Sequence, residues 1–222
     1  MARAFAFRPP RATQRALLEP ERPPGLYVAV EGPIGVGKTT LARLLAARLA
    51  AAEVLEVVDE NPFLHHFYRD IRGYAFQTQI FFFLSRYRQQ GAIRAERDRG
   101  RSVVSDYLFA KDRLFARMTL DPLEFDLYER LYALIAPMTV TPDLVIYLRA
   151  ALPTLLARIA RRDRPFERAL DASYLERLRE EYERFFAEYD EAALLTVDTD
   201  AVDIFRDDDL QTILRHVAAA RP

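Results

Sequence analysis

The chain has 222 residues and a formal net charge of −1, so we expect one domain with a sizeable core, and no overall field favours nucleic acid or an anionic membrane as a partner. Half of the residues are apolar and none is cysteine, which excludes disulfides and thiolate metal sites and agrees with a reducing, cytoplasmic compartment. No apolar run approaches the roughly 20 residues of a membrane span, and no signal peptide is visible.

The first 24 residues differ in composition from the rest of the chain. Arginine and proline are frequent there, which predicts a flexible leader at 1–24 before a single domain at 25–222. An arginine-rich organelle-targeting peptide is the alternative interpretation of the same segment.

Apolar runs and helical periodicities then alternate along the chain. We expect strands at residues 26–31, 54–59, 102–106, 143–148 and 194–198. We expect helices at 38–51, 77–99, 122–135, 152–161, 171–191 and 210–219. This alternation predicts an α/β fold with a five-stranded parallel sheet and helices on both faces. Such folds bind ligands beyond the carboxyl ends of the strands, so functional residues should lie there.

The first predicted strand ends in the sequence EGPIGVGKTT, residues 31–40. It contains the pattern G-x-x-x-x-G-K-[ST] between a strand and a helix, which is the context that this phosphate-binding loop (P-loop) requires. Its glycines let backbone N–H groups point inward onto phosphates, and the helix N-terminus adds partial positive charge. We therefore expect ATP to contact Gly32, Pro33, Ile34, Gly35, Val36, Gly37, Lys38, Thr39 and Thr40.

Lysine is rare in this chain, which has thirty arginines and two lysines. Lys38 must reach the β- and γ-phosphate oxygens as a compact charge on a thin, flexible stem, and a planar guanidinium is a poor replacement. We expect Lys38 to be catalytic and Thr39 to place its hydroxyl on Mg²⁺.

Two carboxylates follow the second and third predicted strands: Glu60 in DENPF and Asp106 in VVSDY. One could accept a proton from a hydroxyl nucleophile, while the other could hold Mg²⁺ directly or through water. We assign the first role to Glu60 and the second to Asp106, and the reverse assignment stays open. Glu60 could instead cap a helix that starts at Asn61-Pro62, and Asp106 could lie in a surface turn.

The stretch RIARRDRPFER carries five arginines: Arg158, Arg161, Arg162, Arg164 and Arg168. A solvated charged face is the usual interpretation of such a run. The cluster follows the fourth strand of a predicted phosphate-binding fold, however, which favours an arginine-rich lid that closes on the transferring phosphoryl group.

Five blocks in order give the chain a family resemblance: EGPIGVGKTT, ENPFLHHFY, FQTQIFFFLSRYRQ, VVSDYLFAKDRLFA and LLARIARRDRPFE. Over roughly residues 26–220 the chain resembles the deoxynucleoside kinase family, in particular the bacterial deoxyadenosine/deoxyguanosine kinase branch. The resemblance implies a P-loop kinase fold and ATP-dependent phosphorylation of the 5′-hydroxyl of a deoxynucleoside in nucleotide salvage.

The resemblance also implies roles for individual residues. Glu60 matches the carboxylate near the 5′-hydroxyl, Tyr68 the tyrosine at the sugar 3′-hydroxyl, and Gln79 the glutamine on the nucleobase. Arg86 is similar to the arginine beside that glutamine, and Asp112 to the aspartate that pairs with it. The lid residues that match are Arg158, Arg162, Arg164 and Glu167. The third strand of the animal enzymes ends in Glu-Arg-Ser, whereas this chain has Asp106-Tyr107-Leu108, so the arginine next to the acceptor oxygen is absent at that position.

The base site and the helix surfaces support two further expectations. Gln79, Arg86 and Asp112 together favour a purine deoxynucleoside, in agreement with the resemblance. The helices at 77–99 and 122–135 are apolar on more than one face, which favours a homodimer, as in the family; coverage by other helices of the same chain is the alternative. A nucleoside monophosphate kinase of the thymidylate kinase type and a non-enzymatic nucleotide-binding module are the competing functions.

Overall fold

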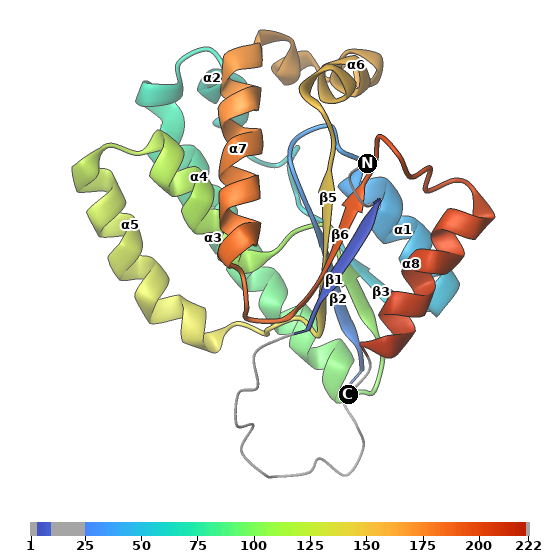
Figure 1. Ribbon diagram of the computed structural model, residues 1–222. Coiled ribbons are helices and arrows are strands. Elements are labelled where there is room, and N and C mark those ends of the chain that lie inside the picture. The colour runs from blue at the N-terminus through green and yellow to red at the C-terminus, as the bar shows by residue number, and fades with distance from the viewer. Residues whose placement is uncertain (1–3, 10–24, 221–222) are drawn as a thin grey trace.

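Parallel strands with buried side chains form the centre of the fold. The computed structural model describes residues 4–9 and 25–220, and it contains a six-stranded sheet in the order β1-β6-β5-β2-β4-β3 (Figure 1). Five strands run parallel: β2 (Tyr27–Glu31), β3 (Ala52–Val54), β4 (Val103–Ser105), β5 (Leu144–Arg149) and β6 (Ala193–Asp198). The predicted α/β class is confirmed, and the sheet has one strand more than the five predicted.

The additional strand, β1 (Phe5–Arg8), lies within the segment expected to be a leader and pairs antiparallel with β6. Arg8 donates hydrogen bonds to the carbonyl oxygens of Phe186 (2.7 Å), Ala187 (2.9 Å) and Tyr189 (2.5 Å) at the end of α7 (Ala172–Glu188). The last carbonyls of a helix lack partners within the helix, so this arginine satisfies them. Residues 10–24 lie outside the described part of the chain, and the domain boundary at residue 24 stays a prediction.

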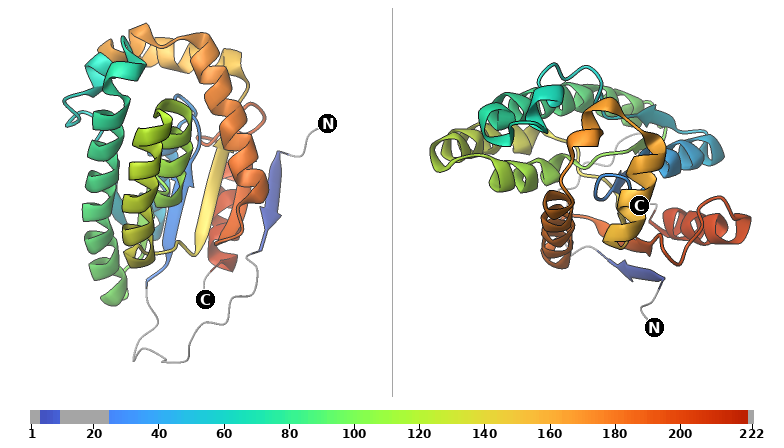
Figure 2. Two further views of the ribbon diagram at one scale, coloured as in Figure 1. Left: turned by 90° about the vertical axis from the view of Figure 1, so that its left-hand side faces the viewer. Right: turned by 90° about the horizontal axis from the view of Figure 1, so that it is seen from above.

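Helices cover both faces of the sheet (Figures 1 and 2). On one face lie α1 (Lys38–Leu49) and α8 (Asp207–Ala219); on the other lie α3 (Ile71–Asp98), α4 (Asp112–Thr119) and α7, with α5 (Pro122–Ile135) outside them. Short helices α2 (Leu64–Phe67) and α6 (Leu152–Arg162) lie near the carboxyl ends of the strands, and η1 (Phe109–Lys111), η2 (Ala136–Met138) and η3 (Pro165–Ala169) connect longer elements. Among the described helices, none has both the length and the apolar character needed to cross a membrane.

Three local differences from the sequence prediction affect the site. Strand β3 ends at Val54 rather than continuing to residue 59. Helix α3 begins at Ile71, where the Asp70 side chain accepts a hydrogen bond from the Gly73 N–H (3.0 Å), and not at residue 77. Helix α4 was not predicted, because it has only eight residues.

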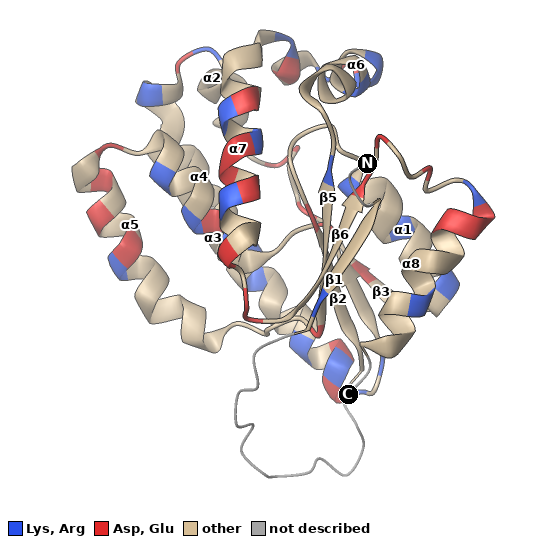
Figure 3. Cartoon of the chain, in the orientation of Figure 1, with Lys and Arg blue, Asp and Glu red and all other residues tan. Residues whose placement is uncertain are grey.

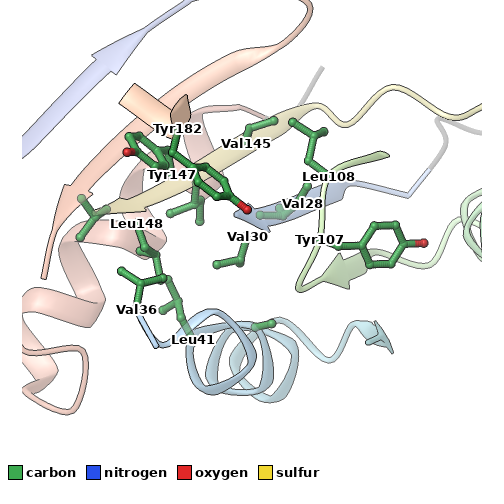
Figure 4. Close-up of a cluster of buried hydrophobic side chains, with 14 of the residues drawn as sticks. Val28, Val30, Val36, Leu41, Tyr107, Leu108, Val145, Tyr147, Leu148 and Tyr182 are labelled. Atoms are coloured by element: carbon green, nitrogen blue, oxygen red, sulfur yellow. The ribbon is translucent and has the colours of Figure 1, made fainter. Parts of the chain in front are cut away.

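Buried apolar side chains attach the P-loop and the helix after it to the central strands of the sheet. Val36 and Leu41 are buried beside Val30 and Leu148 of the central strands (Figure 4). Tyr147 of β5 stacks on Tyr182 of α7, with ring centroids 6.3 Å apart. Gly32 has φ +151°, and a Cβ there would lie 2.2 Å from the Leu148 carbonyl oxygen, so only glycine lets the loop leave β2 this close to β5.

Candidate active site

The P-loop lies between two cavities. The first, of about 280 Å³, is lined by P-loop residues and by Glu56, Gln79, Arg86, Lys111 and Glu167. The second, of about 550 Å³, lies between the P-loop, the α6 arginines and residues 199–205. Gly35, Gly37, Thr40 and Arg162 line both. A phosphoryl group held by this loop would therefore lie between the two cavities, which is the arrangement that a transfer between two substrates requires.

Lys38 lines the first cavity, and its side chain binds backbone carbonyls at the start of its own loop. Its Nζ donates to the carbonyl oxygens of Gly32 (2.7 Å) and Pro33 (3.2 Å). Burial of the ammonium lowers the pKa of Lys38 to about 8, and the Glu31 and Glu56 carboxylates partly offset this effect. In the free protein, Lys38 therefore loses its proton at a lower pH than an exposed lysine would.

Glu60 lines neither cavity, so the structure does not support its assignment as the acceptor-site carboxylate, which stays a prediction. It is exposed in the turn at residues 59–60, because β3 ends five residues earlier than predicted. The apolar residues Leu55 and Val58 made the strand look longer, but their side chains line the first cavity instead. Asn61 next to it is buried, accepts a hydrogen bond from the Phe63 N–H (3.0 Å) and donates one to the Thr78 carbonyl oxygen (3.2 Å).

Glu56 is the carboxylate that this segment brings to the first cavity. Arg86 forms an ion pair with its Oε1 through Nη2 and donates from Nε at 2.9 Å, and Lys111 Nζ lies 3.7 Å from the same oxygen. All the side-chain hydrogen bonds and ion pairs of Glu56 with described residues use Oε1, and none uses Oε2. Burial alone would raise the pKa of Glu56, but the charges of Arg86, Lys111 and Lys38 outweigh it and lower the pKa to about 2. Glu56 is therefore ionised, with one oxygen held and the other free to accept a proton or hydrogen bond.

Asp106 is buried at the end of β4 and joins two parts of the site, so it does not lie in a surface turn. It accepts hydrogen bonds from the Thr39 hydroxyl (2.5 Å) and from the Glu56 backbone N–H (2.7 Å). Burial, and then the Glu56 charge, raises the pKa of Asp106. The P-loop threonine and the Glu56 segment thus have a common partner.

Gln79 and Arg86 line the first cavity two turns apart on α3, and both are buried. The Arg86 guanidinium lies 5.0 Å from the Phe82 ring centroid and pairs with Asp112. Asp112 lies behind Arg86 and does not line the cavity, and its Oδ2 has no hydrogen-bond partner among the described residues. Tyr68 lines the cavity and stacks on Phe166, with centroids 6.2 Å apart.

The predicted lid residues fall into two groups (basic positions are blue in Figure 3). Arg162 pairs with the buried Glu167 (2.5 Å), and Arg164 lies 3.9 Å from the same carboxylate. All three line the first cavity, and Arg162 lines the second as well. Arg158 instead donates to the Val36 carbonyl oxygen (3.1 Å) and to the Thr199 hydroxyl (2.8 Å) in the wall of the second cavity. The closing movement of a lid stays a prediction.

Sequence reasoning missed Glu56 and Lys111 in the cavity wall. A shorter second strand would have placed Glu56 just after its end, but the apolar run concealed that boundary. The scarcity of lysine was a signal for Lys111, because both lysines of the chain line the same cavity.

The fold and this loop define a P-loop phosphotransferase. The family model for deoxynucleoside kinases matches residues 28–220, and the chain belongs to the deoxynucleoside kinase family. It is 39% identical to the deoxyguanosine kinase of Bacillus subtilis over 86% of this chain and 95% of that one, and 31% identical to the deoxyadenosine/deoxycytidine kinase of the same organism over 89% and 94%. The structure of the M. mycoides deoxyadenosine kinase with dCMP and dCDP has the same fold, with a TM-score of 0.77, 23% identity and coverage of 87% of this chain and 100% of that one. The chain is therefore a phosphotransferase that acts on deoxynucleosides.

The lowered pKa of Lys38 leads to a pH prediction. Phosphate binding needs the protonated ammonium, so kcat/KM for ATP should fall about tenfold per pH unit above about pH 8. In the ATP complex the phosphates stabilise the charge, so kcat should hold to higher pH. Steady-state kinetics from about pH 6.5 to 9.5 at saturating deoxynucleoside would measure both. Lys38→Arg is the control: it should be slower by roughly 10²–10³-fold and lack this decline, because a guanidinium stays charged. A wild-type kcat/KM that is level through pH 9 would contradict the assignment.

Proposed function

We propose that the enzyme transfers the γ-phosphoryl group of ATP to the 5′-hydroxyl of a purine deoxynucleoside, in nucleotide salvage in the cytoplasm. The observation that carries this proposal is Glu56, an ionised carboxylate with a free oxygen in a cavity shared with the P-loop. A hydroxyl acceptor must lose a proton as it attacks, and Glu56 Oε2 would receive it. A monophosphate acceptor is already an anion, and a carboxylate facing it would repel it. Family membership also favours the nucleoside acceptor over a monophosphate and over a non-enzymatic module.

On the donor side, the P-loop would bind the phosphates of ATP, and the second cavity would take its base. Lys38 would contact the transferring phosphoryl group, and Arg162 and Arg164 lie where they could stabilise its charge. Arg158 holds the loop in shape through the Val36 carbonyl and can reach ATP from the second cavity wall.

Thr39 and Asp106 are suited to Mg²⁺. A hydroxyl and a carboxylate in direct contact form a pair of hard oxygen ligands, and the described residues contain no cluster of three His, Cys, Asp or Glu that could form a closed metal site. Mg²⁺ is commonly held by one or two protein oxygens together with substrate phosphates and water. Bound there, the ion would neutralise charge on the phosphates.

The purine preference rests on the wall around Gln79 and Arg86. Gln79 can donate and accept, whereas Arg86, fixed by Asp112 and Glu56, only donates. A purine offers a ring-nitrogen acceptor next to an exocyclic group, which suits this combination. The similarity to enzymes named deoxyguanosine kinase and deoxyadenosine/deoxycytidine kinase supports the same choice.

Competition among equimolar deoxynucleosides with ATP tests the function and the preference together. We expect deoxyadenosine or deoxyguanosine monophosphate to appear first, deoxycytidine monophosphate second and thymidine monophosphate last. Gln79→Ala should weaken the binding of every deoxynucleoside by ~1–3 kcal/mol, because it leaves a buried polar edge of the base unpaired. Asp112→Ala should change the ranking, because it frees Arg86. Thymidine phosphorylated first, with the same ranking in Asp112→Ala, would contradict the base-site proposal.

Substitution of the two glutamates distinguishes Glu56 from Glu60 as the proton acceptor. Glu56→Gln should lower kcat by ~10²–10⁴-fold, because an amide cannot accept the proton. Glu60→Gln is the matched control and should stay within about twofold of wild type, as exposed substitutions generally do. Asp106→Asn should raise the Mg²⁺ concentration needed for half-maximal rate. Steady-state kinetics over a Mg²⁺ series would measure these effects in the three variants. An inactive Glu60→Gln beside an active Glu56→Gln would show that Glu60 rather than Glu56 accepts the proton.

We propose further that the enzyme is a homodimer. Its large exposed apolar side chains include a group on α3, α5 and η2 that no described element covers, with Leu123 84% and Leu134 71% exposed; the others are Leu84, Leu127 and Met138. Two-fold pairing of these helices would bury them together. Coverage by described helices of the same chain does not account for them.

Sedimentation velocity at micromolar concentration tests the dimer. The wild type should sediment as a dimer, and Leu127→Arg with Leu134→Arg should sediment as a monomer, because two buried charges would face their symmetry mates. Ala218→Arg adds a charge to α8 on the opposite face of the sheet and should leave the dimer intact. A monomeric wild type would refute the proposal.

A further inference from the structure

Lys111 is a buried cation in the wall of the first cavity, at the end of η1. Only 2% of the residue is exposed, and it is one of two lysines among 32 basic residues. The other is Lys38, which lines the same cavity. Thirty arginines elsewhere in the chain indicate that lysine is retained where the site needs a compact charge on a flexible stem.

Lys111 bridges two carboxylates from different parts of the fold. Its Nζ lies 3.5 Å from Glu31 Oε2 and 3.7 Å from Glu56 Oε1, and 5.2 Å from the Phe115 ring centroid. Glu31 itself is held firmly: it accepts hydrogen bonds from the Gly32 N–H (2.8 Å), the Leu108 N–H (2.8 Å) and the Tyr182 hydroxyl (3.0 Å). Lys111 therefore connects Glu56 to a carboxylate that is fixed beside the first P-loop residue.

Glu56 needs such a connection because its own backbone lies outside the sheet ladder. Residues 55–58 belong to no helix or strand. The Glu56 N–H donates to Asp106 Oδ1 (2.7 Å), which anchors the backbone, but the direction of the carboxylate depends on the contacts of its own oxygens. The Arg86 fork and Lys111 both act on Oε1, from α3 and from η1. With Oε1 held between two elements, Oε2 is left for the acceptor. Arg86 already presents its planar fork to Oε1, and a second guanidinium would compete for the same space, whereas an ammonium is compact.

The residue that follows Asp106 at the end of β4 is not the cation that contacts Glu56. Tyr107, the residue after Asp106, is fully buried and does not line the cavity, and its hydroxyl has no hydrogen-bond partner among the described residues. The cation comes four residues later, at the end of η1.

We propose that Lys111 is a positioning residue for phosphoryl transfer: it holds Glu56 Oε1 against the Glu31 side of the site, so that Oε2 faces the acceptor hydroxyl. The inference rests on the proposed role of Glu56. Lys111 acts through Glu56 and makes no contact with the reacting atoms.

A double-mutant cycle between Lys111 and Glu56 tests this role. Lys111→Met should lower kcat at least about tenfold, because Glu56 would turn toward Arg86. KM for ATP should stay within about threefold, because the P-loop contacts remain. In a Glu56→Gln background the same change should alter kcat less than about threefold, because no proton-accepting carboxylate is left to orient. Arg113→Met, two residues away in a partly buried pair with Glu129 that does not line the first cavity, is the matched control and should leave kcat within about twofold.

Conservative variants and a folding check complete the experiment. Lys111→Arg should recover part of the rate lost in Lys111→Met, because it keeps the charge. If Lys111→Met is unfolded by circular dichroism, Lys111→Gln replaces it in the cycle. Equal losses of kcat in the wild-type and Glu56→Gln backgrounds would overturn the proposal, since they indicate direct contact with substrate or general damage. The proposed function is tested separately: wild type that phosphorylates no deoxynucleoside, or Glu56→Gln with wild-type kcat, would refute that function whatever Lys111 does.

Discussion

A buried chain of alternating charges sets the geometry of this protein's site. It runs from Glu31 through Lys111, Glu56 and Arg86 to Asp112. Ions taken out of water are strongly destabilising unless each has an oppositely charged neighbour, and removal of one partner from a buried pair typically costs about 3–5 kcal/mol. The strand, loop and helices that supply these residues must therefore pack in one relative arrangement, and that arrangement defines the wall of the first cavity.

The rest of the site is organised around this chain. At one end, the Glu31 carboxylate accepts a hydrogen bond from the P-loop Gly32 N–H. This bond ties the chain of charges directly to the phosphate-binding backbone. At the other end, Asp112 fixes the Arg86 guanidinium beside Gln79.

Asp106 adds a cross-link by accepting hydrogen bonds from both Thr39 and the Glu56 backbone. Asp106 thus joins the P-loop to the wall of the first cavity through one hydrogen bond on each side. Arg158, which binds the Val36 carbonyl, supports the same loop from the second cavity.

Sequence reasoning succeeded where a residue's position follows from local pattern. The P-loop was identified because its spacing and its strand–helix context lie within a short stretch of chain. Gln79 and Arg86 came from the family resemblance, and both line the first cavity because residues seven apart share a helix face. Sequence reasoning extended the second strand to residue 59, and so placed Glu60 at the strand end, because a run of apolar side chains predicts burial without distinguishing a sheet from a cavity wall. Strand β1 was missed because four residues before a proline-rich segment carry almost no periodic signal, and pairing with β6 depends on residues nearly two hundred positions away.

The sequence by itself determined the α/β class, the phosphate-binding loop and the family, because these depend on short-range spacing and on residue types that few other structures require. Only the tertiary structure decided that Glu56 rather than Glu60 lines the cavity, that Asp106 joins Thr39 to the Glu56 segment, and that Lys111 reaches Glu56 and Glu31 together. The physical reason is that these contacts join residues 50 to 80 positions apart, in different strands, helices and loops. Their distances depend on how the helices and strands pack, and no local pattern encodes that packing.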